Sequence, residues 1–106
     1  MSKIDMEAII FELISRGGTA KGMAYEALAA AEKGNYEEAE NLLKQADEEL
    51  LAIHNVQTSL IQSEAAGDKN EVSILFVHAQ DHLMTAIEAK NLIECMIKMH
   101  KKIDEK

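Results

Sequence analysis

Two glycine-centred breaks constrain this chain most, because they divide it into three segments that are each long enough for a substantial helix. The breaks are Lys33-Gly34-Asn35 and Ala66-Gly67-Asp68. Glycine suits the left-handed backbone that follows a helix end. In both breaks an Asn or Asp follows the glycine and a glutamate stands three residues later, which resembles a helix-starting capping box. The sequence therefore predicts three helices, near residues 2–33, 36–66 and 69–104.

The composition favours helices over sheets throughout the chain. It is rich in Ala, Leu, Glu, Lys and Met, contains no proline, and has only 4% aromatic residues. Those abundant residues are good helix formers, whereas Val, Thr, Tyr and Phe, which are typical of strands, are sparse. A chain of 106 residues is expected to form one domain, so residues 1–106 are predicted to be a single all-α unit.

Apolar positions recur at alternating spacings of three and four residues in the second and third segments, as in a coiled coil. Short connections make neighbouring helices antiparallel, so we predict an antiparallel three-helix bundle. The predicted seam of the second helix is Ala39, Leu43, Ala46, Leu50, Ile53, Gln57, Leu60 and Glu64. The predicted seam of the third is Leu75, His78, His82, Thr85, Ala89, Leu92, Met96, Met99 and Ile103.

The first and third helices each carry a feature that a simple bundle does not need. Gly17, Gly18 and Gly22 each cost about 1 kcal/mol relative to alanine inside a helix, so the first helix is the weakest by composition. A bend or a close helix contact is predicted near residue 17. The third helix has more apolar surface than one seam can bury, which predicts a self-association surface. The surplus residues are Ile74, Val77, Leu83, Met84, Ile87 and Ile93.

The charge and the cysteine count exclude several classes of function. A formal net charge of −8 argues against nucleic acid as a partner, since phosphate binding needs clustered Lys and Arg. No apolar stretch is long enough to insert into a membrane, and no basic segment followed by an apolar one opens the chain. The single cysteine, Cys95, excludes an intramolecular disulfide and is expected to be a small buried apolar residue. We expect a cytoplasmic protein.

The segment His78-Ala79-Gln80-Asp81-His82 is the best candidate for a functional site. Residues at i, i+3 and i+4 share a helix face, so two imidazoles and a carboxylate converge there. They can be core groups satisfied by Gln57 or Glu64, ligands of a metal ion, or a nucleophilic imidazole with its supporting groups. The residues alone leave these three interpretations open. His54 and His100 are expected to be ordinary surface or boundary residues.

The chain resembles the IIA components of the lactose/cellobiose (diacetylchitobiose) branch of the bacterial phosphoenolpyruvate-dependent sugar phosphotransferase system. The resemblance extends along essentially the whole length and is most specific at Val77-His78-Ala79-Gln80-Asp81-His82-Leu83-Met84-Thr85. It continues in His54-x-x-Gln57-Thr58, in Ala24-Tyr25-Glu26-Ala27-Leu28 and in Gly34-Asn35-Tyr36.

The resemblance implies a homotrimer of three-helix bundles that relays a phosphoryl group. The phosphoryl group would pass from the phosphohistidine of the carrier protein HPr to His78, and then to a cysteine of the cognate IIB component. That component, with the membrane component IIC, takes up and phosphorylates a β-linked disaccharide. His82 and Gln80 fall on neighbouring active-site positions. Asp81 falls on a position near the trimer axis that can hold one divalent cation, such as Mg²⁺, and no organic cofactor is expected.

One stretch departs from the family pattern, and alternatives to the relay remain. Family members often carry Ala-Arg-Ser after a glycine of the first helix, where this chain has Ala20-Lys21-Gly22. Lysine keeps the positive charge but loses the bidentate fork of arginine. The Ala-Tyr and Val-His-Ala-Gln segments favour a cellobiose or diacetylchitobiose type over a lactose type. The alternatives are a non-catalytic metal-binding oligomer and a regulatory homologue that signals instead of feeding a transporter.

Overall fold

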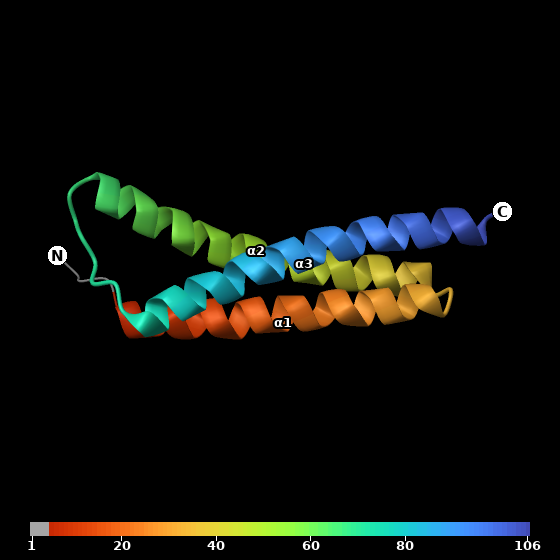
Figure 1. Cartoon of the computed structure of the whole chain (residues 1–106), viewed down its shortest axis with the longest axis horizontal. Coiled ribbons are helices and arrows are strands. Elements are labelled where there is room, and N and C mark those ends of the chain that lie inside the picture. The colour runs from red at the N-terminus through yellow and green to blue at the C-terminus, as the bar shows by residue number, and fades with distance from the viewer. Residues whose placement is uncertain (1–4) are drawn as a thin grey trace.

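The computed structural model describes residues 5–106 and consists of three long α-helices (Figure 1). They are α1 (Met6–Glu32), α2 (Tyr36–Ala65) and α3 (Ile74–Asp104). α2 runs antiparallel to α1, and α3 returns parallel to α1, giving a rod of 58 × 22 × 20 Å. The predicted all-α, antiparallel three-helix bundle is confirmed. Among residues 5–106, no helix is both long and apolar enough to cross a bilayer.

The two glycine breaks lie where the sequence places them, although the caps differ from the prediction. Gly34 and Gly67 have φ angles of 84° and 104°, the left-handed conformation that glycine adopts without steric cost. Asn35 is the residue before α2, but its side chain makes no capping hydrogen bond. The predicted start of the first helix near residue 2 lies outside the described residues. Within them, the Asp5 side chain caps α1 by accepting a 3.2 Å hydrogen bond from the Ala8 amide.

The predicted start of the third helix at residue 69 is wrong, because α3 begins at Ile74. Ser73 is the cap, and its hydroxyl accepts a 3.1 Å hydrogen bond from the Phe76 amide. Asp68 and Glu71 are exposed in the connection between α2 and α3 and do not form the predicted cap. Ser73 accepts a hydrogen bond from one of the free amides at the helix start. Apolar residues that follow it, such as Phe76, pack in the bundle, and this packing stabilises a helix that begins here.

The helix that is weakest by composition is the centre of the bundle. Both α2 and α3 pack along α1, whereas they barely contact each other, and their paths diverge at one end of the rod (Figure 1). The face of α1 that they cover carries small residues over most of its length, which lets the helix backbones approach closely. These buried positions alternate by three and four residues: Ile10, Leu13, Gly17, Ala20, Ala24, Ala27 and Ala31.

The predicted seam of α2 is largely confirmed, but the predicted seam of α3 is wrong. The buried residues of α3 are Ala79, Leu83, Ala86, Lys90, Ile93 and Ile97. Each follows a predicted seam position by one residue, which corresponds to a rotation of about 100° around the helix axis. The helix has apolar residues on both faces, so periodicity alone could not select the inner one. The face that packs on the small residues of α1 combines Ala79 and Ala86 with larger side chains such as Leu83 and Ile93, and only this contact distinguishes it from the outer face.

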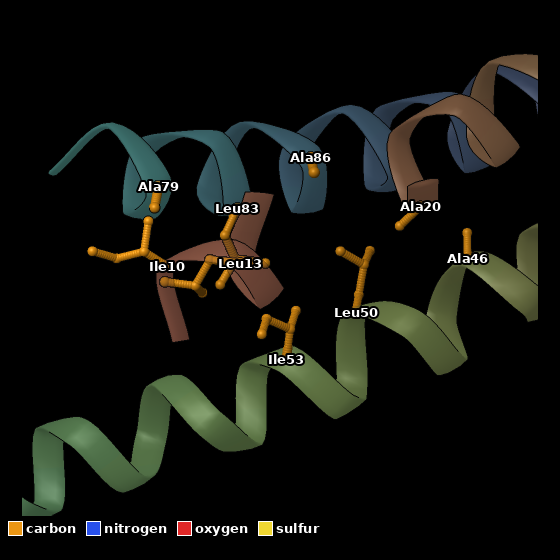
Figure 2. Packing of buried hydrophobic residues seen from close by; sticks show 9 residues of the cluster. All are labelled: Ile10, Leu13, Ala20, Ala46, Leu50, Ile53, Ala79, Leu83 and Ala86. Atoms are coloured by element: carbon orange, nitrogen blue, oxygen red, sulfur yellow. The ribbon is translucent and has the colours of Figure 1, made fainter. Parts of the chain in front are cut away.

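The core around the candidate site joins all three helices (Figure 2). Leu13 of α1, Ile53 of α2 and Leu83 of α3 are the largest fully buried side chains, and they point toward one another. Complete burial of such a side chain contributes about 1.5–3 kcal/mol. This cluster fixes the rotation of α3 about its axis and with it the direction of the residues next to Leu83.

Candidate functional site

His78 and His82 lie one turn apart near the start of α3, and their rings stack. The ring centroids are 6.4 Å apart with an interplanar angle of 24°. His78 is exposed, whereas His82 is half-buried. Ala79 and Leu83 follow them directly and are completely buried. The core therefore holds the backbone of this segment while the first imidazole remains accessible to a partner.

His82 lies against α1 at its paired glycines. A β-carbon on Gly17 would stand 3.4 Å from His82 Cδ2, and one on Gly18 would stand 3.3 Å from His82 Nε2. The close helix contact predicted near residue 17 is thus present, between α1 and α3. Neither imidazole makes a side-chain hydrogen bond within residues 5–106; the carbonyl of His82 accepts one from Thr85.

Gln80 lies on the side of α3 that faces α2, away from the histidine pair. Gln57 Nε2 donates a 2.9 Å hydrogen bond to Gln80 Oε1, and the same amide lies 3.7 Å from Met84 Sδ. Residues two apart on a helix are separated by about 200° around its axis, so one chain does not bring Gln80 next to His78. The core interpretation, in which Gln57 or Glu64 satisfies the imidazoles, is not supported. Gln57 pairs with Gln80 instead, and Glu64 is exposed.

Asp81 is exposed on α3 and forms no ion pair within the described part of the chain. No group of three or more His, Cys, Asp or Glu residues within residues 5–106 is arranged to hold a metal ion. The interpretation of His78, Asp81 and His82 as three ligands of one metal, supplied by a single chain, therefore has no support in the structure.

An apolar groove of about 520 Å³ lies between α2 and α3 and is lined by residues of these two helices. It exists because these two helices each pack on α1 and hardly touch each other. Gln57 and Met84 line it near Gln80, and His54 lines it from α2. The remaining lining residues are Asp47, Leu50, Leu51, Ile87, Lys90 and Asn91.

An ion-pair cluster around the buried Lys90, beside this groove, was not foreseen from the sequence. Lys90 of α3 is only 8% exposed, and its Nζ lies 2.5 Å from Asp47 Oδ1 and 2.8 Å from Glu94 Oε2. Burial lowers the pKa of Lys90, but the bonds to the two carboxylates outweigh it and leave the pKa above its ordinary value. The hydrogen bond from Lys90 lowers the pKa of Glu94. The signal in the sequence that could have predicted this ion pair is a lysine at a position of the apolar repeat, with a glutamate four residues later.

His100 and Cys95 of α3 lie away from the histidine pair. Tyr36 Oη lies 2.8 Å from His100 Nδ1 and donates a 3.0 Å bond to Asp104 Oδ2, which ties the start of α2 to the end of α3. Burial, followed by the bond to Asp104, raises the pKa of Tyr36. His100 is thus a boundary residue, as predicted. The expectation that Cys95 is buried is wrong, since its side chain is exposed on a face of α3 that α1 and α2 leave uncovered.

Comparison with known proteins identifies the family. The family model described as "PTS system, Lactose/Cellobiose specific IIA subunit" matches residues 8–101. The lichenan-specific phosphotransferase enzyme IIA component of Bacillus subtilis is 48% identical over 101 residues, which cover 95% of this chain and 92% of that protein.

Solved structures give the same result. The cellobiose-specific enzyme IIA of Bacillus anthracis is 44% identical, with a TM-score of 0.92 over 99% of this chain and 96% of that one. The IIA(Chitobiose) protein of Escherichia coli, solved in complex with HPr, is 37% identical, with a TM-score of 0.82 over 96% of this chain and 99% of that one. The family resemblance noted in the sequence is confirmed: the chain belongs to the lactose/cellobiose-specific IIA family of the sugar phosphotransferase system.

Proposed function

We propose that this chain is a phosphoryl carrier that accepts the group on His78 and passes it to a partner protein. The observation that carries the proposal is the accessibility of His78 beside a second imidazole, on a helix whose neighbouring face, with Ala79 and Leu83, is buried in the core. A neutral imidazole nitrogen is a competent nucleophile at neutral pH. The N–H of His82 can donate to phosphoryl oxygens as charge is redistributed.

The relay consists of two displacements at phosphorus. In the first, a ring nitrogen of His78 attacks the phosphoryl group of the donor phosphohistidine, so that one P–N bond forms while another breaks. In the second, the thiolate of a cysteine on the acceptor attacks the same phosphorus, forming a P–S bond and releasing the neutral imidazole. Both steps need positioning and charge stabilisation more than bond activation by the carrier. An exposed histidine lets two partners use one site in turn.

The partners and the sugar follow from the family and from the relatives. HPr is proposed as the donor, supported by the structure of the related IIA(Chitobiose) protein with HPr. The acceptor is a cysteine of the cognate IIB component, which works with the membrane component IIC. A β-linked disaccharide of the cellobiose or diacetylchitobiose type is the proposed cargo, in line with the cellobiose and lichenan specificities named for two relatives. The relay would operate in the cytoplasm.

The test is the intact mass of the chain after incubation with phosphoenolpyruvate, enzyme I and HPr. We expect a gain of one phosphoryl group, about 80 Da, that is labile in acid, as expected of a phosphohistidine. His78→Gln should abolish the gain, whereas His54→Gln, which changes another exposed histidine, should not. No gain in the native chain, with HPr shown to be phosphorylated, would refute the proposal.

The outer face of α3 supports a homotrimer. Many large apolar side chains of this helix are about half exposed or more, which a monomer in water does not favour. They continue along the whole helix, so a parallel association of α3 from three copies would cover them. The exposed residues are Ile74, Leu75, Val77, Met84, Leu92, Met96, Met99 and Ile103.

Asp81 lies on the exposed side of α3 and could meet its copies at the axis of such a trimer. One chain supplies a single carboxylate, so a divalent cation such as Mg²⁺ fits only where Asp81 from two or three copies converges. Without a cation or protonation, the converging carboxylates would repel one another. Bound there, a divalent cation would offset two of the converging negative charges.

Sedimentation of Asp81→Leu at fixed protein concentration tests the assembly. We expect Asp81→Leu to retain or strengthen the trimer, because it removes the repulsion at the axis, and we expect added Mg²⁺ to change nothing in this variant. Asp68→Leu, in the exposed connection, controls for the loss of one negative charge. Dissociation of Asp81→Leu to monomers would show instead that the carboxylate and a cation hold the copies together.

A further inference from the structure

The paired glycines of α1 leave a space that the imidazole of His82 occupies. The β-carbon position of Gly18 is 3.3 Å from His82 Nε2, and that of Gly17 is 3.4 Å from His82 Cδ2. Gly17 also faces the α3 backbone, with its β-carbon position 3.7 Å from Leu83 Cα. A separation near 3.3 Å is tighter than most contacts that a β-carbon makes in proteins, so any side chain on Gly18 would press on the ring.

Backbone conformation does not explain these glycines. Within residues 5–106, only Gly34 and Gly67 have positive φ, so Gly17 and Gly18 have conformations open to any residue. Each nevertheless costs α1 about 1 kcal/mol relative to alanine. Gly22, one turn later, has no atom within 4 Å of its β-carbon position. Gly17 and Gly18 therefore differ from Gly22 in that both lie against the edge of the His82 imidazole.

We propose that Gly17 and Gly18 are positioning residues for phosphoryl transfer, because the missing side chains form a seat that holds His82 stacked beside His78. This inference rests on the proposed function of His78 as the phosphoryl acceptor. The seat fixes one edge of the His82 ring against α1, while Leu83 fixes the backbone beneath it. The ring is thereby oriented before a partner arrives, and no reorganisation is needed when the phosphoryl group is transferred.

The seat makes a distinctive prediction for Gly18→Ala. The new methyl group meets the far end of a half-buried side chain, which can move by the few tenths of an ångström required. The fold should therefore tolerate the methyl group, and α1 should gain helix propensity. Transfer should slow nonetheless, by about tenfold, since misplacement of a catalytic group by 1 Å can cost a factor of about 100.

The experiment measures the rate of phosphorylation by phospho-HPr in native protein, Gly18→Ala, Gly22→Ala, His82→Gln and the double variant Gly18→Ala/His82→Gln. Gly22→Ala is the matched control, because it makes the same change in the same helix where space is open. We expect Gly22→Ala to transfer at the native rate. We expect the double variant to be no slower than His82→Gln alone, since Gly18 acts only through His82.

Nuclear magnetic resonance provides a readout that does not depend on transfer. In native protein, the ring proton on His82 Cδ2 should show Overhauser contacts to the α protons of Gly17 and Gly18. In Gly18→Ala these contacts and the His82 ring shifts should change, while those of His54 stay constant. Absence of the contacts in native protein would overturn the seat.

The remaining outcomes decide whether the seat matters for transfer. A native rate in Gly18→Ala, despite a displaced His82 ring, would overturn the positioning role. The positioning role would also be overturned if Gly18→Ala slowed transfer by the same factor in the native and in the His82→Gln background. Failure of the relay itself would appear separately, as a native chain that never gains phosphate, and the positioning role would then fall while the Overhauser contacts remained.

Discussion

Two polar clusters on α3 use the same spacing and have opposite surroundings. Lys90 and Glu94 are four residues apart, as are His78 and His82, and the two clusters lie about 18 Å apart along the helix. Lys90 is buried and bonded to two carboxylates. His78 is exposed, and neither imidazole has a side-chain hydrogen bond in the described chain.

The contrast in burial and bonding indicates that Lys90 and its partners stabilise the fold, whereas the histidine pair is free to react. A buried charge is tolerated only when its partners are present, and Lys90 has used its partners to join α3 to α2 where these helices otherwise barely touch. An exposed imidazole costs little without a partner and can exchange partners. One cluster is therefore expected to govern stability, and the other chemistry.

His78→Gln should give the largest effect and should confine it to chemistry. Because the side chain is exposed and unbonded, the free energy of unfolding should stay within about 0.5 kcal/mol of native. Phosphoryl acceptance should disappear entirely. Urea unfolding at matched protein concentration, alongside the mass measurement, checks both. A decrease of several kcal/mol in the free energy of unfolding would show that His78 contributes to the core, and the contrast with Lys90 would not hold.

Lys90→Ala should reverse that pattern. Loss of the buried stem and of the charge that neutralises Asp47 and Glu94 should reduce the free energy of unfolding by about 1–3 kcal/mol. Lys90→Met keeps the volume and should lose less, within about 1 kcal/mol of native. Both should still accept phosphate. Equal destabilisation by the two variants would show that charge, and not packing, dominates at this site.

Tyr36→Phe tests the polar contacts at the closed end of the bundle. It removes one hydroxyl, with its bonds to His100 and Asp104. We expect a loss of about 0.5–1.5 kcal/mol and increased amide exchange in the last turns of α3. Exchange near His78, at the other end, should stay unchanged. Loss of protection over the whole helix would mean that the two ends are one cooperative unit.

The smallest effect should be a change in the acid dependence of stability. The pKa of Glu94 is lowered in the folded chain, so its contribution is present above the unfolded value near 4.5 and is lost as the pH falls through the folded value. Lys90, whose pKa is raised, loses its contribution only as the pH rises beyond about 10.5. Glu94→Gln should therefore flatten the stability profile below about pH 5, measured by urea unfolding. An unaltered acid limb would contradict the assignment.

The fold was predictable wherever a local signal acted alone. Gly34 and Gly67 end helices because of their own backbone freedom, and the α2 seam has one apolar face, so both were identified correctly. The start of α3 was misplaced because Asp68 and Ser73 both offer caps, and packing of the following apolar segment favours Ser73. The inner face of α3 was missed because both faces are apolar and only contact with α1 distinguishes them.

The candidate site divides in the same way. The spacing of His78 and His82 places the two imidazoles side by side on any α-helix, so their proximity follows from the sequence. The separation of Gln80 from them also follows from helix geometry, but its bond to Gln57 depends on how α2 lies against α3. Neither the burial of Lys90 nor the approach of His82 to Gly18 could be read from one helix.

The sequence by itself determined three helices, their breaks, the family and the histidine pair, because these depend on backbone propensities and on spacings within one segment. Tertiary structure decided that α1 is the central helix, which face of α3 turns inward, and which polar groups of α3 are bonded. The physical reason is that burial depends on contacts among helices. Small residues on α1 set how closely α3 approaches, and that approach, together with the register of α2, determines which side chains remain free.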